Sequence, residues 1–351
     1  MSYELTVEPL GRTIEIQEGQ TILDACLRQG IWLPHACGHG LCGTCKVEIT
    51  EGEIDHGAVS PFALMDFERD QGKALACCAT VKEDAIIEAE IDLDADARCY
   101  PVKDFAGKIV RIEQLNSDIK GIWIDIGEEG MDFQPGQYVN FYLPGIEKPR
   151  AYSISNPASE RRIIELLIRL VPGGVGTTYV HEKLAVGDEV RITGPYGQFF
   201  VRKSEPLPSL FLAGGSGLSS PKSMIIDMLE GGWDLPITLI HGVRTAKDVF
   251  FAELFEGLAA KHSNFRYYPA LSEKSDADWT GQTGFVHEVA ASLFGGKFAG
   301  MKAYLCGPPP MIDACIDTLM KGRLFEKDIY MERFLSAADS TKKVSALFRK
   351  I

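Results

Sequence analysis

The 351-residue sequence lacks the features expected of a membrane, secreted or nucleic-acid-binding protein. Its first residues contain neither the basic stretch nor the apolar core of a secretory signal, and no apolar run approaches the length of a membrane span. We therefore expect a cytoplasmic protein. A net charge of −13 makes nucleic acid a poor partner. The seven histidines have no metal-binding spacing, and no Ser–His–Asp set or carboxylate pair indicates hydrolytic chemistry.

The acidic charge is concentrated at one end of the chain. Residues 1–96 contain 6 Lys and Arg against 19 Asp and Glu, whereas residues 97–351 contain 30 of each. Two interpretations remain open for this asymmetry. It can serve solubility alone, or it can form an acidic docking face that steers a partner of complementary charge.

The hydrophobic pattern predicts three domains in series. Residues 1–96 show alternating strand-like runs around one helical stretch and end in an acidic run, and the proline-containing residues 97–102 that follow are predicted to be a linker. Residues 103–203 contain short alternating strands separated by turn signals, which predicts a small antiparallel β-barrel. Residues 204–351 alternate strands with helices, which predicts a doubly wound parallel sheet with its ligand at the carboxyl ends of the strands.

Four cysteines in the first domain have the spacing of a plant-type [2Fe–2S] site. The glycines between them would let the backbone approach a compact anion closely and direct N–H groups at its sulfurs. The predicted iron ligands are Cys37, Cys42, Cys45 and Cys77. Nine cysteines without an export signal favour ligands and buried thiols over disulfides.

Competing metal sites fit this spacing less well. A zinc ribbon needs two separate C-x2-C pairs, and the sequence contains only one here, Cys42 and Cys45. A Rieske centre needs two Cys/His pairs, and only Cys37 and His39 could form one. The fourth ligand is ambiguous because Cys77 and Cys78 are neighbours, and adjacent extended residues point to opposite faces. We prefer Cys77, which follows an apolar Ala-Leu-Ala run.

Two segments of the second domain suit a flavin. Residues 150–153, Arg-Ala-Tyr-Ser, are placed at the end of the third barrel strand and offer aromatic and hydroxyl groups. Residues 172–178 are glycine-rich and can open a helix, whose N-terminus would bind a pyrophosphate. An ordinary strand and an ordinary turn are the alternatives for these two segments.

Two segments of the third domain suit a nicotinamide nucleotide. Residues 213–221, AGGSGLSSP, lie between a predicted strand and a predicted helix, although Ser220 replaces the last glycine of G-x-G-x-x-G. Residues 306–311, CGPPPM, end a later strand in a turn stiffened by three prolines. Cys306 is either a nicotinamide contact or a structural thiol.

These motifs together resemble the ferredoxin–NAD(P)+ reductase-like oxygenase reductases with an N-terminal ferredoxin module. The resemblance covers the full length. It is strongest to the reductase components of bacterial multicomponent phenol hydroxylases, through CGHGLCGTC, SPFALMDFERD, LACCA, GPYGQFFVR, AGGSGLSSP, KAYLCGPPPMID and MERF. It implies a β-grasp ferredoxin domain, an FAD-binding barrel and an NAD-binding α/β domain.

The resemblance also implies roles for individual residues. Arg150, Tyr152 and Ser153 would bind FAD, with Ile168 and Arg169 beside it and Gly174 and Thr177 at its pyrophosphate. Gly215, Gly217, Gly307 and Pro308 would line the NADH site, with Cys306 near the hydride path and Phe334 near the flavin ring. Cys306 and Ser153 are the expected catalytic pair.

The implied activity is electron transfer from NADH through FAD and the cluster to a diiron hydroxylase that oxidises phenol. A flavin placed between the other two centres would convert a two-electron hydride into single electrons for the cluster. Arg244 and Lys247 would suit a 2′-phosphate, but the resemblance favours NADH. A reductase for another oxygenase and a cluster-based redox sensor are the alternatives.

Overall fold

The computed structural model describes residues 1–273 and 278–334. The chain divides into two compact units, Met1–Lys103 and Asp104–Ile351, and each is considered by itself. Within the described residues, none of the helices combines the length and the hydropathy that a bilayer crossing requires.

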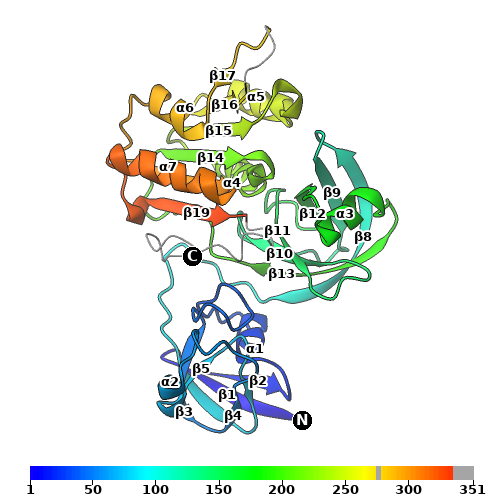
Figure 1. The fold of residues 1–351 in the computed structure, drawn as a ribbon, viewed down its shortest axis with the longest axis vertical. Helices are drawn as coiled ribbons and strands as arrows, with labels where there is room; N and C mark the ends of the chain where they lie inside the picture. The colour runs from blue at the N-terminus through cyan, green and yellow to red at the C-terminus, as the bar shows by residue number, and fades with distance from the viewer. Residues whose placement is uncertain (274–277, 335–351) are drawn as a thin grey trace. The chain divides into compact units, whose positions relative to one another are not determined.

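The N-terminal unit is built on a five-stranded mixed sheet in the order β2-β1-β7-β3-β5 (Figure 1). Strand β1 pairs with β2 in antiparallel and with β7 in parallel fashion, as in a β-grasp fold. Helix α1 (Ile22–Arg28) starts at Thr21, whose hydroxyl accepts a hydrogen bond from the Asp24 N–H at 3.3 Å. The other elements are β1 (Ser2–Glu8), β2 (Arg12–Gln17), β3 (Lys46–Glu51), β4 (Ile54–Asp55), α2 (Asp66–Asp70), β5 (Lys73–Leu75), β6 (Thr80–Val81) and β7 (Ala85–Glu88).

The end of the predicted linker packs on this same unit. The Val102 N–H donates to the Leu27 carbonyl at 3.0 Å, and the Val102 side chain is buried. A Cβ added at Gly30 would lie 3.4 Å from the Cys99 carbonyl oxygen and 3.5 Å from Pro101. Residues 99–102 therefore form an ordered edge of the N-terminal unit.

The second unit begins with an antiparallel sheet of order β11-β10-β13-β8-β9-β12. An isolated bridge between Ile154 and Leu166 joins its two ends, so the sheet is nearly closed into the predicted barrel. Its elements are β8 (Lys103–Gln114), β9 (Ile119–Asp125), β10 (Tyr138–Tyr142), β11 (Arg150–Ser153), β12 (Ile163–Arg169), α3 (Val175–Glu182) and β13 (Glu189–Tyr196). Alternate residues such as Ile122 and Ile124 fill its core.

The rest of this unit is a parallel sheet of order β17-β16-β15-β14-β18-β19. Its elements are β14 (Ser209–Gly214), η1 (Gly215–Leu218), α4 (Ser219–Glu230), β15 (Ile237–Val243), η2 (Ala246–Asp248), α5 (Ala252–Lys261), β16 (Phe265–Leu271), β17 (Gln282–Thr283), α6 (Val286–Leu293), β18 (Lys302–Gly307), α7 (Pro309–Lys321), η3 (Glu326–Asp328) and β19 (Ile329–Arg333).

Helices cover both faces of this sheet, which confirms the doubly wound prediction. Phe211 on β14 packs in one core with residues of α4 and α5, whereas its neighbour Leu212 packs in another with α6 and α7. The strand order changes direction between β14 and β18, so the ligand crevice is expected beyond the carboxyl ends of these two strands. Both nucleotide motifs of the sequence lie at that point.

Candidate functional site

The four predicted iron ligands form two pairs in the N-terminal unit. Cys37 and Cys42 share a side-chain hydrogen bond, and Cys45 and Cys77 share another. Among the described residues no group of three or more Cys, His, Asp or Glu is arranged to hold a single metal ion. A two-iron cluster divides four thiolates between two metals, so paired thiols are the arrangement that it requires.

Backbone N–H groups point at the sulfurs of this loop. The N–H groups of His39 and Leu41 each lie 3.4 Å from Cys37 Sγ. The Gly40 N–H donates to Cys77. Gly40 has a φ of +72°, and a Cβ there would lie 2.9 Å from the Ala58 carbonyl oxygen, so only glycine fits without displacement. The donors and the close backbone approach both fit a cluster with anionic sulfurs.

The two adjacent cysteines have different surroundings. Hydrogen bonds, first from Cys45 and then from the Gly40 N–H, lower the pKa of Cys77 to about 6. Burial raises the pKa of Cys78 to about 12, and its Sγ lies 3.6 Å from that of Cys77. Cys77 thus shares a hydrogen bond with a second predicted ligand and receives a backbone N–H, so Cys77 stays the predicted fourth ligand.

The Arg-Ala-Tyr-Ser segment forms its own strand, β11, which corrects its expected place at the end of the preceding strand. Strand β11 pairs antiparallel with β10, with Tyr152 opposite Val139. The Tyr152 ring packs edge-on against Phe141, with 6.3 Å between the ring centroids. The prediction missed this strand because a turn after β10 interrupts the alternating pattern.

The glycine-rich segment opens helix α3, as predicted, and Arg150 lies beside it. A Cβ at Gly176 would lie 3.3 Å from Arg150 Cγ and 3.5 Å from its Nε. The cationic side chain thus lies against the first turn of the helix, where free N–H groups also attract anions. Thr177 Oγ1 accepts from the Val171 N–H at 3.0 Å and donates to the Gly174 carbonyl at 3.1 Å, which shapes the turn.

Two predicted flavin neighbours have other contacts. The Ile168 side chain is fully buried in the barrel core, and its carbonyl lies 3.0 Å from His181 Nε2. Arg169 pairs with Asp118, with 3.0 Å between Nε and Oδ2. The Ile168 side chain therefore fills the inside of the barrel, while the Arg169 side chain is half-exposed.

The two nucleotide motifs meet at the carboxyl ends of β14 and β18. A Cβ at Gly217 would lie 2.3 Å from the Cys306 carbonyl oxygen, and one at Gly307 would lie 2.9 Å from Met311. Gly215 has a φ of +54°, and a Cβ added there would have no atom within 4 Å. The Phe334 N–H donates to the Gly307 carbonyl at 2.9 Å, which brings the end of β19 to this crevice. Pro308 is the N-cap of α7 and fixes the turn.

Sequence analysis did not assign a role to Glu332, which the structure places at the centre of the site. Its Oε2 accepts from Ser153 Oγ at 2.9 Å, from Ser220 Oγ at 2.7 Å and from Cys306 Sγ at 3.5 Å. Burial raises the pKa of this carboxyl. Burial, followed by the charge of Glu332, raises the pKa of Cys306 well above its usual range, so Cys306 stays a thiol.

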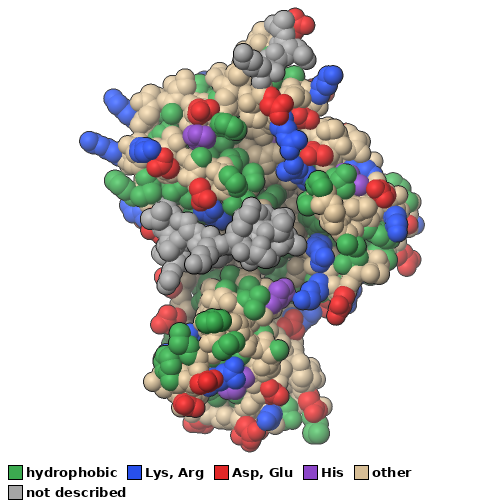
Figure 2. Space-filling view, in the orientation of Figure 1, with side chains coloured by type: hydrophobic (Ala, Val, Ile, Leu, Met, Phe, Trp, Pro, Cys, Tyr) green, Lys and Arg blue, Asp and Glu red, His purple; other side chains and the backbone are tan. Residues whose placement is uncertain are grey.

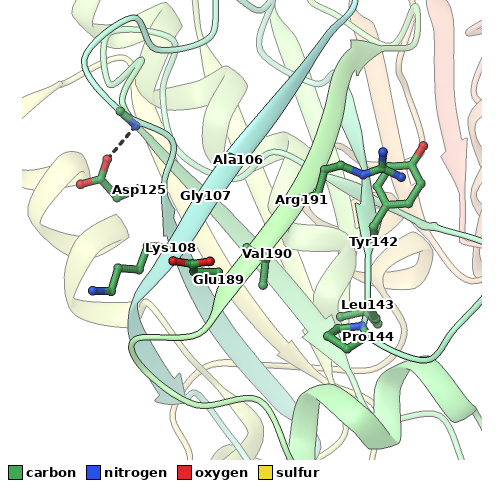
Figure 3. A pocket seen from close by; sticks show the side chains of 11 residues that line it. Ala106, Gly107, Lys108, Asp125, Tyr142, Leu143, Pro144, Glu189, Val190 and Arg191 are labelled. Atoms are coloured by element: carbon green, nitrogen blue, oxygen red, sulfur yellow. Dashed lines mark hydrogen bonds between the residues drawn. The ribbon is translucent and has the colours of Figure 1, made fainter.

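A shallow groove of about 730 Å³ lies elsewhere on the barrel, along β8 and β13 (Figure 3). Arg191 and Tyr142 point toward each other at one side of it, with the guanidinium 3.7 Å from the ring centroid. The residues that line it include none of the predicted cofactor-binding residues. It is therefore separate from the site around Glu332.

Comparison with known families assigns each part of the chain to a cofactor-binding domain. Residues 5–82 match the 2Fe-2S iron-sulfur cluster binding domain. Residues 106–201 match the oxidoreductase FAD-binding domain, and residues 211–317 match the oxidoreductase NAD-binding domain. The chain thus binds a [2Fe–2S] cluster, FAD and NADH in separate domains.

Several relatives share the whole arrangement. The chain is 55% identical to the reductase component of phenol 2-monooxygenase from Pseudomonas sp. (strain CF600) and 55% identical to the phenol hydroxylase P5 protein of Acinetobacter pittii (strain PHEA-2), covering 100% of this chain and of each relative. Among solved structures, an Amycolatopsis cytochrome P450 reductase superposes with a TM-score of 0.83 at 32% identity, over 95% of this chain and 98% of that one. The ferredoxin reductase in carbazole 1,9a-dioxygenase has a TM-score of 0.75 at 26% identity, over 95% and 99%. The chain therefore belongs to the family of phenol hydroxylase reductase components, iron–sulfur flavoproteins with an NAD-binding domain.

Proposed function

We propose that this protein passes electrons from NADH, through FAD and a [2Fe–2S] cluster, to the hydroxylase component of a phenol 2-monooxygenase. The observation that carries the proposal is the meeting of Ser153 from the barrel and Cys306 from the nucleotide-binding sheet at one oxygen of Glu332. A reaction between two bound cofactors needs residues of both binding sites at one point. The relatives' activity supports phenol hydroxylase as the acceptor.

The cysteine loop holds the cluster in this proposal. Cys37 and Cys42 would bind one iron and Cys45 and Cys77 the other, following the pairs in which the thiols lie. The N–H groups of His39, Gly40 and Leu41 then stabilise negative charge on the sulfurs. We assign residues 1–96 to the cluster domain, 97–102 to a linker, 103–203 to the FAD domain and 204–351 to the NAD domain.

FAD, when bound, accepts a hydride from NADH and releases electrons singly to an iron–sulfur centre. Its pyrophosphate would be bound by Arg150 and the N-terminus of α3, with Gly174 and Thr177. Tyr152 would offer an aromatic face, and Arg169 lies on the adjoining strand β12. Ser153 and Cys306 would touch the reacting rings. Phe334, whose N–H donates to the Gly307 carbonyl, would pack beside the flavin ring. Gly215 has open space beside it where NADH would approach the backbone, whereas Gly217 lets the same loop pack against the Cys306 carbonyl and so shapes the NADH site.

The N-terminal unit docks the hydroxylase, which we propose to be a diiron protein. Acidic side chains lie around the edge of this unit (Figure 2), and residues 1–96 carry all the net negative charge of the chain. Beside the cysteine loop, Leu41 is 67% exposed and Phe62 is 91% exposed. An apolar contact near the cluster with an acidic surround fits a partner surface that is apolar at its centre and basic at its rim.

Reconstitution tests the proposed acceptor. The holoprotein should support NADH-dependent phenol hydroxylation with a phenol hydroxylase component, and the rate should fall as salt screens the acidic surround. Reduction of cytochrome c without phenol hydroxylation would assign the protein to another oxygenase. Absence of steady NADH turnover with any acceptor would favour a redox sensor, and a salt-independent rate would remove the electrostatic part of docking.

A further inference from the structure

A buried ion pair joins the FAD-binding barrel to the NAD-binding sheet. Lys222 Nζ on α4 lies 2.6 Å from Glu165 Oε2 on β12. The two side chains are 7% and 5% exposed, respectively. In the other Lys–carboxylate pairs among the described residues of this unit, at least one partner is open to solvent.

The surrounding groups are polar, buried and shared between the two domains. Lys222 Nζ also donates to the Ser155 carbonyl at 3.2 Å and lies 5.0 Å from the centroid of the Phe251 ring. Ser223 Oγ donates to the Asn156 carbonyl at 2.6 Å, and Asn156 Oδ1 accepts from the Glu165 N–H at 2.8 Å. These contacts connect the first turns of α4 to two neighbouring segments of the barrel.

The ion pair is a weak device for stability. Removing two charges from water costs about as much free energy as their attraction returns, and well-packed apolar side chains of similar size often stabilise as well or better. Glu165 Oε1 is buried with no hydrogen-bond partner, which adds to that cost. A directional pair does have one advantage over an apolar contact, because it fixes the register of two surfaces that could otherwise slide.

That register bears directly on the candidate site. Lys222 lies two residues after Ser220, whose hydroxyl contacts Glu332, and five residues after Gly217, which abuts Cys306. The same turns of α4 therefore contact the reaction site through Ser220 and the barrel through Lys222. A shift of α4 along β12 would move the nucleotide loop relative to Ser153.

We propose that the Lys222–Glu165 ion pair is a positioning device that fixes the nucleotide loop against the flavin barrel, so that its loss slows hydride transfer more than it weakens NADH binding. This inference rests on the proposed function, because it concerns the approach of the two cofactors. Neither residue touches the reacting atoms in this proposal. Both act through the placement of α4.

The test uses the holoprotein and an apolar replacement of the pair. Lys222→Met leaves Glu165 unpaired, whereas Lys222→Met with Glu165→Leu removes both charges and keeps the volume. Lys203→Met is the matched control, since Lys203 pairs with Asp227 on the same helix at 2.9 Å but is 46% exposed. Anaerobic stopped-flow measures flavin bleaching by NADH, a titration gives the NADH dissociation constant, and hydrogen–deuterium exchange over residues 215–230 reports the docking of α4.

The double variant should bleach its flavin about tenfold to a hundredfold more slowly than the wild type. Its NADH dissociation constant should stay within about threefold of the wild-type value. Exchange over residues 215–230 should rise, and Lys203→Met should match the wild type in all three measurements. If the double variant fails to fold, Glu165→Gln replaces it; the amide keeps an acceptor for Lys222, so its bleaching rate should lie between those of the wild type and Lys222→Met.

An unchanged bleaching rate in folded variants would overturn the proposal, whatever their thermal stability. A weakened NADH affinity at an unchanged limiting rate of flavin bleaching would also overturn it, because the ion pair would then contribute to NADH binding and not to hydride transfer. If the wild type itself showed no bleaching by NADH, the proposed function would fail, while a rise in exchange in the variant would still report the role of the pair in docking α4.

Discussion

Ser153 on β11 donates a hydrogen bond to Glu332 on β19, with 2.9 Å between Oγ and Oε2. This contact joins a residue of the FAD-binding barrel to the last strand of the NAD-binding sheet. The same oxygen accepts from Ser220 and Cys306, so three side chains from separate segments meet at one buried carboxylate. The candidate reaction site is therefore a product of packing between two domains.

Removing the hydroxyl of Ser153 should slow reduction of the flavin. Ser153→Ala and Glu332→Gln are each expected to lower the anaerobic rate of flavin bleaching by about tenfold to a hundredfold, because the groups that position the reacting rings are lost. Ser159→Ala is a matched control: Ser159 Oγ also donates to a glutamate, Glu230, at 2.9 Å, but on the exposed surface. A wild-type rate in Ser153→Ala would exclude Ser153 from the reaction.

The assignment of the fourth iron ligand can be tested by paired substitutions. Cys77→Ser should lose the visible absorption of the cluster, because Cys77 shares a hydrogen bond with Cys45 and receives the Gly40 N–H. Cys78→Ala should keep the absorption. The reverse result would transfer the ligand role to Cys78.

The cysteine loop should tolerate a side chain at one glycine better than at another. Gly40→Ala should lower the iron content strongly, since its Cβ would lie 2.9 Å from both Ala58 O and Cys78 Sγ. Gly38→Ala is the control, because Gly38 has a similar φ of +67° with nothing within 4 Å of an added Cβ. Both variants carry the same backbone penalty, so equal iron content in the two would show that close approach does not matter here.

Buried His241 should make stability depend on pH. Burial lowers the pKa of His241 to about 4, while the unfolded chain titrates near 6.5. As the pH falls below 6.5 only the unfolded chain takes up this proton, so the folded state should lose about 2 kcal/mol between pH 7.5 and pH 5 from this group. His241→Phe keeps an aromatic ring against Phe250, and the variant should lose about 2 kcal/mol less stability over this pH range than the wild type. Urea midpoints of both proteins at the two pH values measure this difference. Parallel losses in both proteins would contradict the assignment.

Local patterns in the sequence predicted much of this structure. The cysteine spacing, the helix after the glycine-rich turn and the alternating strands all depend on residues close together in the chain. Cys26 and Cys315 are buried, in line with the expectation of buried thiols among the nine cysteines. The short helix α2 was missed because five residues are too few to show a period, and β11 because a turn separates its four residues from the preceding strand.

Contacts between segments distant in the chain could not be predicted from the sequence. Glu332 was visible only as part of the MERF motif, and nothing in its neighbours indicates that Ser153 lies 179 positions away in the chain but within hydrogen-bond distance. The Lys222–Glu165 pair is similar, because a lysine near the start of a helix ordinarily faces solvent. Both features follow from how the barrel packs on the parallel sheet.

Anaerobic titration of the purified holoprotein with NADH tests the central claim most directly. Visible spectra report the flavin, and electron paramagnetic resonance reports the reduced cluster. The account predicts that NADH bleaches the flavin and then produces a reduced-cluster signal, which Cys77→Ser should lack while its flavin still bleaches. A flavin that NADH leaves oxidised, or a bleached flavin with the wild-type cluster still oxidised, would contradict electron transfer from NADH to the cluster.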